Sequence, residues 1–115
     1  MRMPSLILVA DDEPVLRGAL VDLLVDEGYR VVTAGDGEEA LQVAGDDPPD
    51  LIISDVAMPR MDGLELVHHL RERGVWIPVV LISGHAARAE LPGVRFVRKP
   101  FDLGWLMDEV AAALS

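Results

Sequence analysis

The sequence predicts an α/β protein, built as a doubly wound open sheet of five parallel strands with helices on both faces. Five short runs rich in Val, Ile and Leu recur along the chain, at residues 6–10, 31–34, 51–54, 79–83 and 94–97. They are apolar throughout, which is typical of parallel strands covered on both faces. Helical patterns separate them, and right-handed crossovers then distribute the helices over both faces of one sheet.

The first helical pattern covers residues 14–27. Pro14 suits the first turn of a helix, and Gly28 supplies a stop. The side chains expected to share its apolar face are Leu16, Leu20, Leu23 and Leu24. The sequence therefore predicts an amphipathic helix between the first two strands.

The next two helical patterns cover residues 37–44 and 63–73. We expect the former to end at Gly45, before the turn-forming stretch DDPPD, and the latter to end at Gly74. The apolar side of the latter is expected to consist of Leu64, Val67 and Leu70.

The last two helical patterns differ in strength. Residues 84–93 contain few large apolar side chains and end in Pro92 and Gly93, so this fourth helix is expected to be short or irregular. Residues 102–114 begin with Asp102, a good N-cap residue. The side chains expected to point inward from this fifth helix are Leu103, Leu106, Met107 and Val110.

The composition limits the function. A chain of 115 residues, half of them hydrophobic, fits one domain over residues 1–115. The net charge of −10 argues against nucleic acid and anionic membranes as partners, because both bind Lys/Arg clusters; it suits a metal cation or a basic partner surface. The absence of cysteine excludes thiol chemistry. With no signal-peptide pattern and no long apolar run, the expected location is the cytoplasm.

Polar residues follow four of the five predicted strands, at the edge of the sheet where ligands bind in this fold class. They are Asp11, Asp12, Glu13, Asp55, Ser83, Arg98 and Lys99. If the four strands are neighbours, these groups converge. Clustered carboxylates repel one another and favour a cation, and oxygen ligands with few protein groups suit Mg²⁺.

A cation beside Asp55, with a hydroxyl and an ammonium nearby, describes a site for phosphoryl transfer. Aspartate can attack phosphorus to give an aspartyl phosphate. Ser83 could donate to one phosphoryl oxygen, and Lys99 could pair with another. Lys99 is the only lysine among ten basic residues; a compact ammonium can approach a single oxygen, where arginine offers a wide fork.

The motifs at these strand ends resemble those of the receiver domains of response regulators, the CheY-like superfamily. The stretches are VADDE at 9–13, SDVAMPRMDG at 54–63, LISG at 81–84 and FVRKPF at 96–101. They cover nearly the whole chain in order. The resemblance implies a flavodoxin-like sheet with strand order 2-1-3-4-5.

The resemblance also implies roles for individual residues. Asp55 would be the phosphoacceptor, with Asp12 bound directly to Mg²⁺ and Asp11 helping through water. The backbone carbonyl of Ala57 would be the third protein ligand. Ser83 and Lys99 would contact the phosphoryl oxygens.

Two further expectations follow from the resemblance. The Lys99–Pro100 bond is expected to be cis, as in most receivers. Phe96 matches the aromatic residue that turns inward when the Ser83 hydroxyl is drawn to phosphate, although it is equally compatible with plain core packing.

As a receiver, the protein would be a phosphoacceptor switch with slow autodephosphorylation rather than an enzyme acting on other substrates. Its phosphodonor would be a phosphohistidine of a sensor histidine kinase or a histidine phosphotransfer protein. An effector protein or domain would read the switch, and a dimer is compatible with the resemblance. The chain shows no effector domain of its own, which leaves open a single-domain regulator or a fragment of a longer protein.

The sequence departs from the receiver pattern in the length of one segment, and Phe96 lacks the hydroxyl that a tyrosine would have. The span from Ser83 to Lys99 is short by about one to two helical turns. The loss falls in the expected fourth helix, and puts in doubt the signalling face that receivers build from the fourth helix, fifth strand and fifth helix.

Three alternatives to the receiver make different demands on the sequence. A haloacid-dehalogenase-type phosphatase also uses a strand-end Asp, but it needs a second Asp two positions later, where this chain has Ala57. A receiver-like docking adaptor would not need the intact acidic cluster. The stretch GDGEEA at 35–40 fits a dinucleotide-binding pattern, but its acidic side chains would repel a pyrophosphate.

Overall fold

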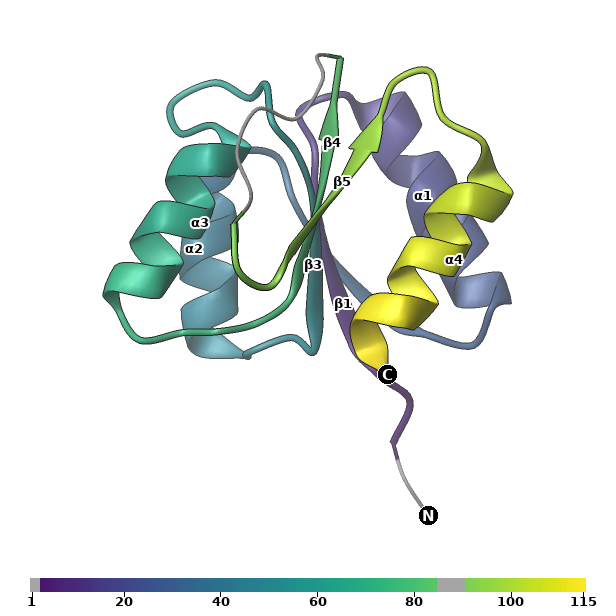
Figure 1. Ribbon diagram of the computed structural model, residues 1–115, viewed down its shortest axis with the longest axis horizontal. Helices are drawn as coiled ribbons and strands as arrows, with labels where there is room; N and C mark the ends of the chain where they lie inside the picture. The colour runs from purple at the N-terminus through teal and green to yellow at the C-terminus, as the bar shows by residue number, and fades with distance from the viewer. Residues whose placement is uncertain (1–2, 85–90) are drawn as a thin grey trace.

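The computed structural model describes residues 3–84 and 91–115, which form one five-stranded parallel sheet between two helical layers (Figure 1). The strand order is β2-β1-β3-β4-β5, which confirms the predicted topology. The strands are β1 (Leu6–Ala10), β2 (Arg30–Ala34), β3 (Leu51–Asp55), β4 (Val79–Ser83) and β5 (Val94–Arg98).

Four helices lie within the described residues. They are α1 (Pro14–Asp26), α2 (Gly37–Asp46), α3 (Gly63–Glu72) and α4 (Leu103–Leu114). Helices α2 and α3 cover one face of the sheet, and α1 and α4 cover the other (Figure 1). Helix α4 is the fifth helix of the sequence prediction. The predicted fourth helix, at 84–93, lies mostly in 85–90, outside the described residues.

The three central strands are buried as predicted, whereas the two edge strands are not. Every residue of β1 and β3 is buried, and so is β4 up to its last residue. The edge strands β2 and β5 mix buried and exposed positions because only one side of each is paired. Their polar side chains, Arg30, Thr33, Arg95 and Arg98, take exposed positions.

Helix boundaries agree with the sequence patterns to within two residues. Helix α1 begins at Pro14, and Gly28 follows its end with a φ of 93°. Helix α2 continues through Gly45 to Asp46, two residues past the predicted end. The prolines of the following turn, rather than the glycine, end this helix. Asp102 caps α4 as predicted by accepting a hydrogen bond from the backbone N–H of Trp105.

Two predictions about helix faces were wrong. Leu64 is exposed, and Leu66 takes its place in the core. At about 100° per residue, Leu64 lies more than about 100° from the middle of the buried arc of α3. Leu103 is also exposed; at the first position of α4 its side chain tilts back toward the N-terminus and past the packed layer.

None of the helices in the described residues has the length and apolar character needed to cross a membrane.

Candidate functional site

The carboxylates predicted to converge do so at the carboxyl ends of β1 and β3. These strands are paired neighbours, with Ala10 opposite Ser54, so the residues that follow come together. The cluster consists of three carboxylate oxygens that lie within 4.8 Å of one another, one each from Asp11, Asp12 and Asp55. Among the described residues this is the one group of acidic or metal-binding side chains with the geometry to hold an ion.

Asp11 is the most buried member of the cluster, at 1% exposure. Its Oδ1 accepts a hydrogen bond from the Glu13 N–H at 2.9 Å, whereas its Oδ2 is buried without a hydrogen-bond partner. Burial raises the pKa of this carboxyl above its ordinary value, and the negative charge of Asp55 raises it further. A buried, partnerless carboxylate oxygen within a group of three carboxylates fits a hard cation.

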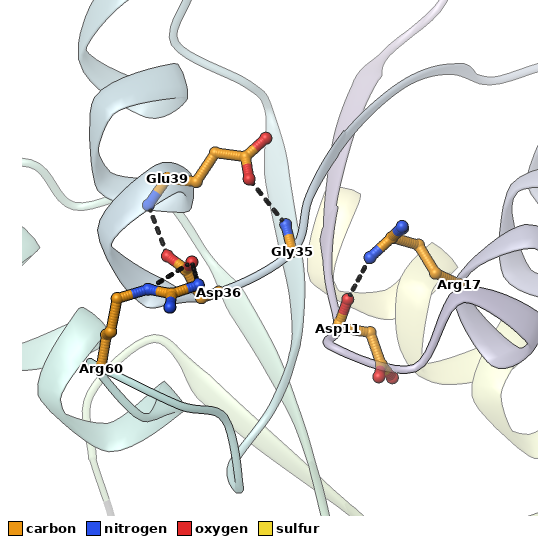
Figure 2. Close-up of polar contacts among 6 residues, drawn as sticks. All are labelled: Asp11, Arg17, Gly35, Asp36, Glu39 and Arg60. Atoms are coloured by element: carbon orange, nitrogen blue, oxygen red, sulfur yellow. Dashed lines mark hydrogen bonds and ion pairs between the residues drawn. The ribbon is translucent and has the colours of Figure 1, made fainter.

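Asp12 and Glu13 face solvent, and only Asp12 joins the cluster. Glu13 occupies the N-cap position of α1 without a side-chain capping bond. A side chain of α1 stabilises the turn between β1 and α1: Nη1 of Arg17 donates a 2.7 Å hydrogen bond to the Asp11 carbonyl (Figure 2).

Asp55 ends β3 with its side chain 7% exposed. The Lys99 ammonium donates to its Oδ2 at 2.8 Å, and the Ala57 N–H donates to its Oδ1 at 3.3 Å. The hydrogen bond to Asp55, together with the charges of Asp55 and Asp11, raises the pKa of Lys99. The lysine is therefore cationic at neutral pH and faces the carboxylate cluster.

Lys99 and Ser83 are brought together by the pairing of β4 with β5. Ser83 lies opposite Arg98 in the register, and the Lys99 N–H donates to the Ser83 carbonyl at 2.7 Å. The Lys99–Pro100 bond is cis, as the resemblance implied. The backbone at the end of β5 thus directs the lysine inward while Arg98 is exposed.

The loop between β3 and α3 is tightly folded over Asp55. The Gly63 N–H donates to the Val56 carbonyl at 2.8 Å, and a Cβ on Gly63 would lie 2.5 Å from the Asp55 carbonyl oxygen. Only glycine permits that approach. Asp62 and Glu65 then form a reciprocal capping box at the start of α3.

Ala57 and Phe96 lie on different sides of the site. Ala57 is exposed in the β3–α3 loop, two residues after Asp55. Phe96 lies opposite Leu81 in the β4–β5 pairing and packs, partly buried, against the core on the α2 and α3 side.

Sequence reasoning missed three residues that contact the site or its loops: Arg17, Asp36 and Arg60. Arg17 could have been noticed, because it lies one turn inside a predicted helix that begins beside Asp11. Asp36 and Arg60 form an ion pair although they lie 24 residues apart, and no local sequence pattern predicts such a contact.

The structure also explains why GDGEEA is not an anion site. Asp36 caps α2 by accepting from the Glu39 N–H at 2.8 Å, and Glu39 in turn accepts from the Gly35 N–H at 3.0 Å (Figure 2). The amides of this turn that a pyrophosphate would need are thus occupied by the protein's own carboxylates.

Residues 7–111 match the family model "Response regulator receiver domain". The chain belongs to this family. Receiver domains are signalling modules of two-component systems and act with sensor histidine kinases, so the family agrees with the resemblance seen in the motifs.

Relatives and solved structures agree with this assignment. The receiver is 33% identical over 120 aligned positions to the transcriptional regulatory protein PdtaR of Mycobacterium tuberculosis, covering 98% of this chain and 58% of that protein. This chain thus spans little more than half of that relative's length.

Two solved structures are similar along their whole length. The receiver domain of the hybrid histidine kinase CckA is 39% identical with a TM-score of 0.83, covering 96% of this chain and 99% of that one. The response regulator TrrA of Thermotoga maritima, solved with Mg²⁺ and beryllofluoride, is 34% identical with a TM-score of 0.86 and the same coverage.

Proposed function

We propose that this receiver is a phosphoacceptor switch in two-component signalling, with Asp55 as the residue that is phosphorylated. The observation that carries the proposal is the joint geometry of the site. Three carboxylates gather within 4.8 Å, and the chain's only lysine holds Oδ2 of the central one at 2.8 Å. A nucleophilic carboxylate, a cation site and a fixed ammonium are the parts that phosphoryl transfer requires.

In the proposed reaction an oxygen of Asp55 attacks the phosphorus of a phosphohistidine. The new O–P bond forms as the N–P bond breaks, and the imidazole nitrogen keeps the electron pair and takes up a proton. Lys99 remains charged and pairs with an oxygen of the transferred group, to which Ser83 also donates. Both residues act by position and charge, with no proton transfer of their own.

The residues present fit a Mg²⁺ ion. Asp12 and Asp55 would bind it with the backbone carbonyl of Ala57, and Asp11 would bind through water. When bound, Mg²⁺ neutralises charge that builds up on the phosphoryl oxygens. The buried Oδ2 of Asp11, which has no hydrogen-bond partner, supports this donor set.

The protein is proposed to act in the cytoplasm, with a sensor histidine kinase or a histidine phosphotransfer protein as its phosphodonor. Residues 1–115 would act as one receiver domain, read by an effector protein or by a domain outside this chain. Phe96 would respond to Ser83 by packing alone, because it has no hydroxyl. Slow hydrolysis of the aspartyl phosphate would reset the switch.

A mass measurement tests the proposal. The parent, incubated with Mg²⁺ and an acyl phosphate, is expected to gain one phosphoryl group, whereas Asp55→Asn is expected to gain none. Omission of Mg²⁺ should prevent the gain in the parent. An equal mass gain in parent and Asp55→Asn would overturn the assignment of Asp55. Sustained turnover of a phosphate ester would overturn the switch in favour of a phosphatase.

A further inference from the structure

The loop that carries Ala57 is held at its far end by a contact outside the site. Arg60, at the tip of the loop, has a φ of 65°, a left-handed conformation that non-glycine residues seldom adopt. Its Nε donates to Oδ2 of Asp36 at 3.0 Å, and its Nη2 donates to the same oxygen (Figure 2). A side-chain contact therefore holds the loop tip in an unfavourable backbone conformation.

The carboxylate of Asp36 is held in place by a second contact besides the one with Arg60. Its side chain is 9% exposed, and its two oxygens have separate partners. Oδ1 accepts from the Glu39 N–H at 2.8 Å as the N-cap of α2, and Oδ2 accepts from Arg60. Because the cap holds the carboxylate on a helix, Arg60 binds a fixed partner rather than a mobile one.

A backbone contact lies beside the ion pair. The Gly37 N–H donates to the Met61 carbonyl at 3.2 Å. A Cβ on Gly37 would lie 2.3 Å from that carbonyl oxygen, so a side chain at this position would push the loop away. Ala34, the last residue of β2, accepts through its carbonyl the N–H of Asp11 at 3.1 Å. The end of β2 and the start of α2 thus contact both stretches of chain that supply the proposed metal ligands, although they supply none themselves.

We infer that Asp36 and Arg60 are a positioning pair for the metal site: they hold the β3–α3 loop on the N-terminus of α2, so that the Ala57 carbonyl is already in place when Mg²⁺ binds. The inference rests on the proposed function, since it takes Ala57 as a ligand. Residues that orient the ligands of a metal ion commonly change the affinity for that ion, although they do not contact it themselves. Without the pair, the ion must bind a loop that still has to be ordered.

The test measures the dissociation constant of Mg²⁺ by calorimetry in the parent, Asp36→Asn and Arg60→Gly. Asn retains an oxygen for the cap, and Gly suits the left-handed backbone, so both variants are expected to fold. Each is expected to weaken Mg²⁺ binding about threefold to tenfold. Backbone amides of 57–62 should exchange hydrogen faster in both variants, even without Mg²⁺.

Two further variants separate positioning from general stability. Arg60→Lys, which can still reach Asp36 with one hydrogen bond, should recover part of the affinity. The double variant Asp36→Asn, Arg60→Gly should bind Mg²⁺ no more weakly than the single variant with the lower affinity, because both substitutions remove the same contact. Arg95→Gln is the matched control: it breaks the surface ion pair of Arg95 with Glu109, at 3.0 Å, and should leave Mg²⁺ affinity unchanged.

The outcomes distinguish this inference from the proposed function. A parent that binds Mg²⁺, with variants that are less stable but bind it equally well, would overturn the positioning role alone. A parent that binds no Mg²⁺ would overturn the proposed function and the inference together.

Discussion

The Lys99 ammonium donates a 2.8 Å hydrogen bond to Oδ2 of Asp55, although the two residues lie 44 positions apart in the chain. They meet because β3, β4 and β5 are consecutive in the sheet and parallel, so that all three end at the same edge. The lysine thus pairs with the acidic side chain that we propose to be phosphorylated.

Lys99→Ala is expected to slow phosphorylation of Asp55 by about 10²-fold, because one fixed charge on the transferred group is lost. The rate of mass gain with an acyl phosphate at saturating Mg²⁺ measures this. Arg98→Ala is the control, since the neighbouring arginine is exposed. Equal rates for the parent and Lys99→Ala would exclude the proposed role of the lysine.

Asp11→Asn is expected to stabilise the protein in the presence of a chelator. It removes a buried charge that is repelled by Asp55, while an amide oxygen can still accept from the Glu13 N–H. We expect a gain of about 1 kcal/mol, or about 4–8 °C in Tm. Thermal unfolding followed by circular dichroism measures the shift.

The same variant should lose most of the Tm increase that Mg²⁺ gives the parent, since ligand binding stabilises by an amount set by affinity. The Tm advantage of the variant should therefore shrink as Mg²⁺ is added, and reverse once the ion stabilises the parent by more than about 1 kcal/mol. A variant that is destabilised under both conditions would contradict the repulsion argument.

Gly63→Ala is expected to destabilise the protein by about 1–3 kcal/mol, because the new methyl group meets backbone in a packed region. It would lie 2.5 Å from the Asp55 carbonyl oxygen and 3.0 Å from a methyl carbon of Leu81. Urea unfolding measures the free energy.

Gly45→Ala is the matched control for this steric argument. Gly45 lies inside α2, and a Cβ there would have no neighbouring atom within 4 Å. It should therefore stabilise the protein by about 0.5–1 kcal/mol, through helix propensity. Similar losses in both variants would show that the close approach at Gly63 is unimportant.

Acid is expected to weaken the contact between Asp36 and Arg60. The capping N–H of Glu39, followed by the guanidinium of Arg60, lowers the pKa of Asp36 below its ordinary value of 3.8. A carboxyl with a lowered pKa contributes stability that is fully present above 3.8 and is lost as the pH falls through its folded-state pKa.

Asp36→Asn should therefore be less stable than the parent at neutral pH, and the difference should shrink as the pH falls below 3.8. Urea unfolding of both proteins across this range measures the difference. A gap that stays constant with pH would mean that the charge of Asp36 does not stabilise the fold. Arg95→Gln again serves as a control for removing a surface ion pair.

The sequence by itself predicted the five strands, the helices α1, α2, α3 and α4 between or after them, and the candidate residues of the site. Continuous apolar runs are typical of strands inside a covered sheet, and parallel strands end at one edge, so the acidic residues after β1 and β3 were expected to meet if these strands were neighbours. The motif resemblance added the strand order and the cis bond at Lys99, both of which the structure bears out.

Only the tertiary structure decided the contacts that hold the site in place. Leu64 fits an apolar helical spacing, yet the sheet buries Leu66, because the rotation of α3 depends on how its ends are anchored. Arg60 reaches Asp36 only because α2 and α3 pack side by side on one face (Figure 1). Local patterns report which residues are buried or polar, whereas such a pairing follows from packing between segments far apart in the chain.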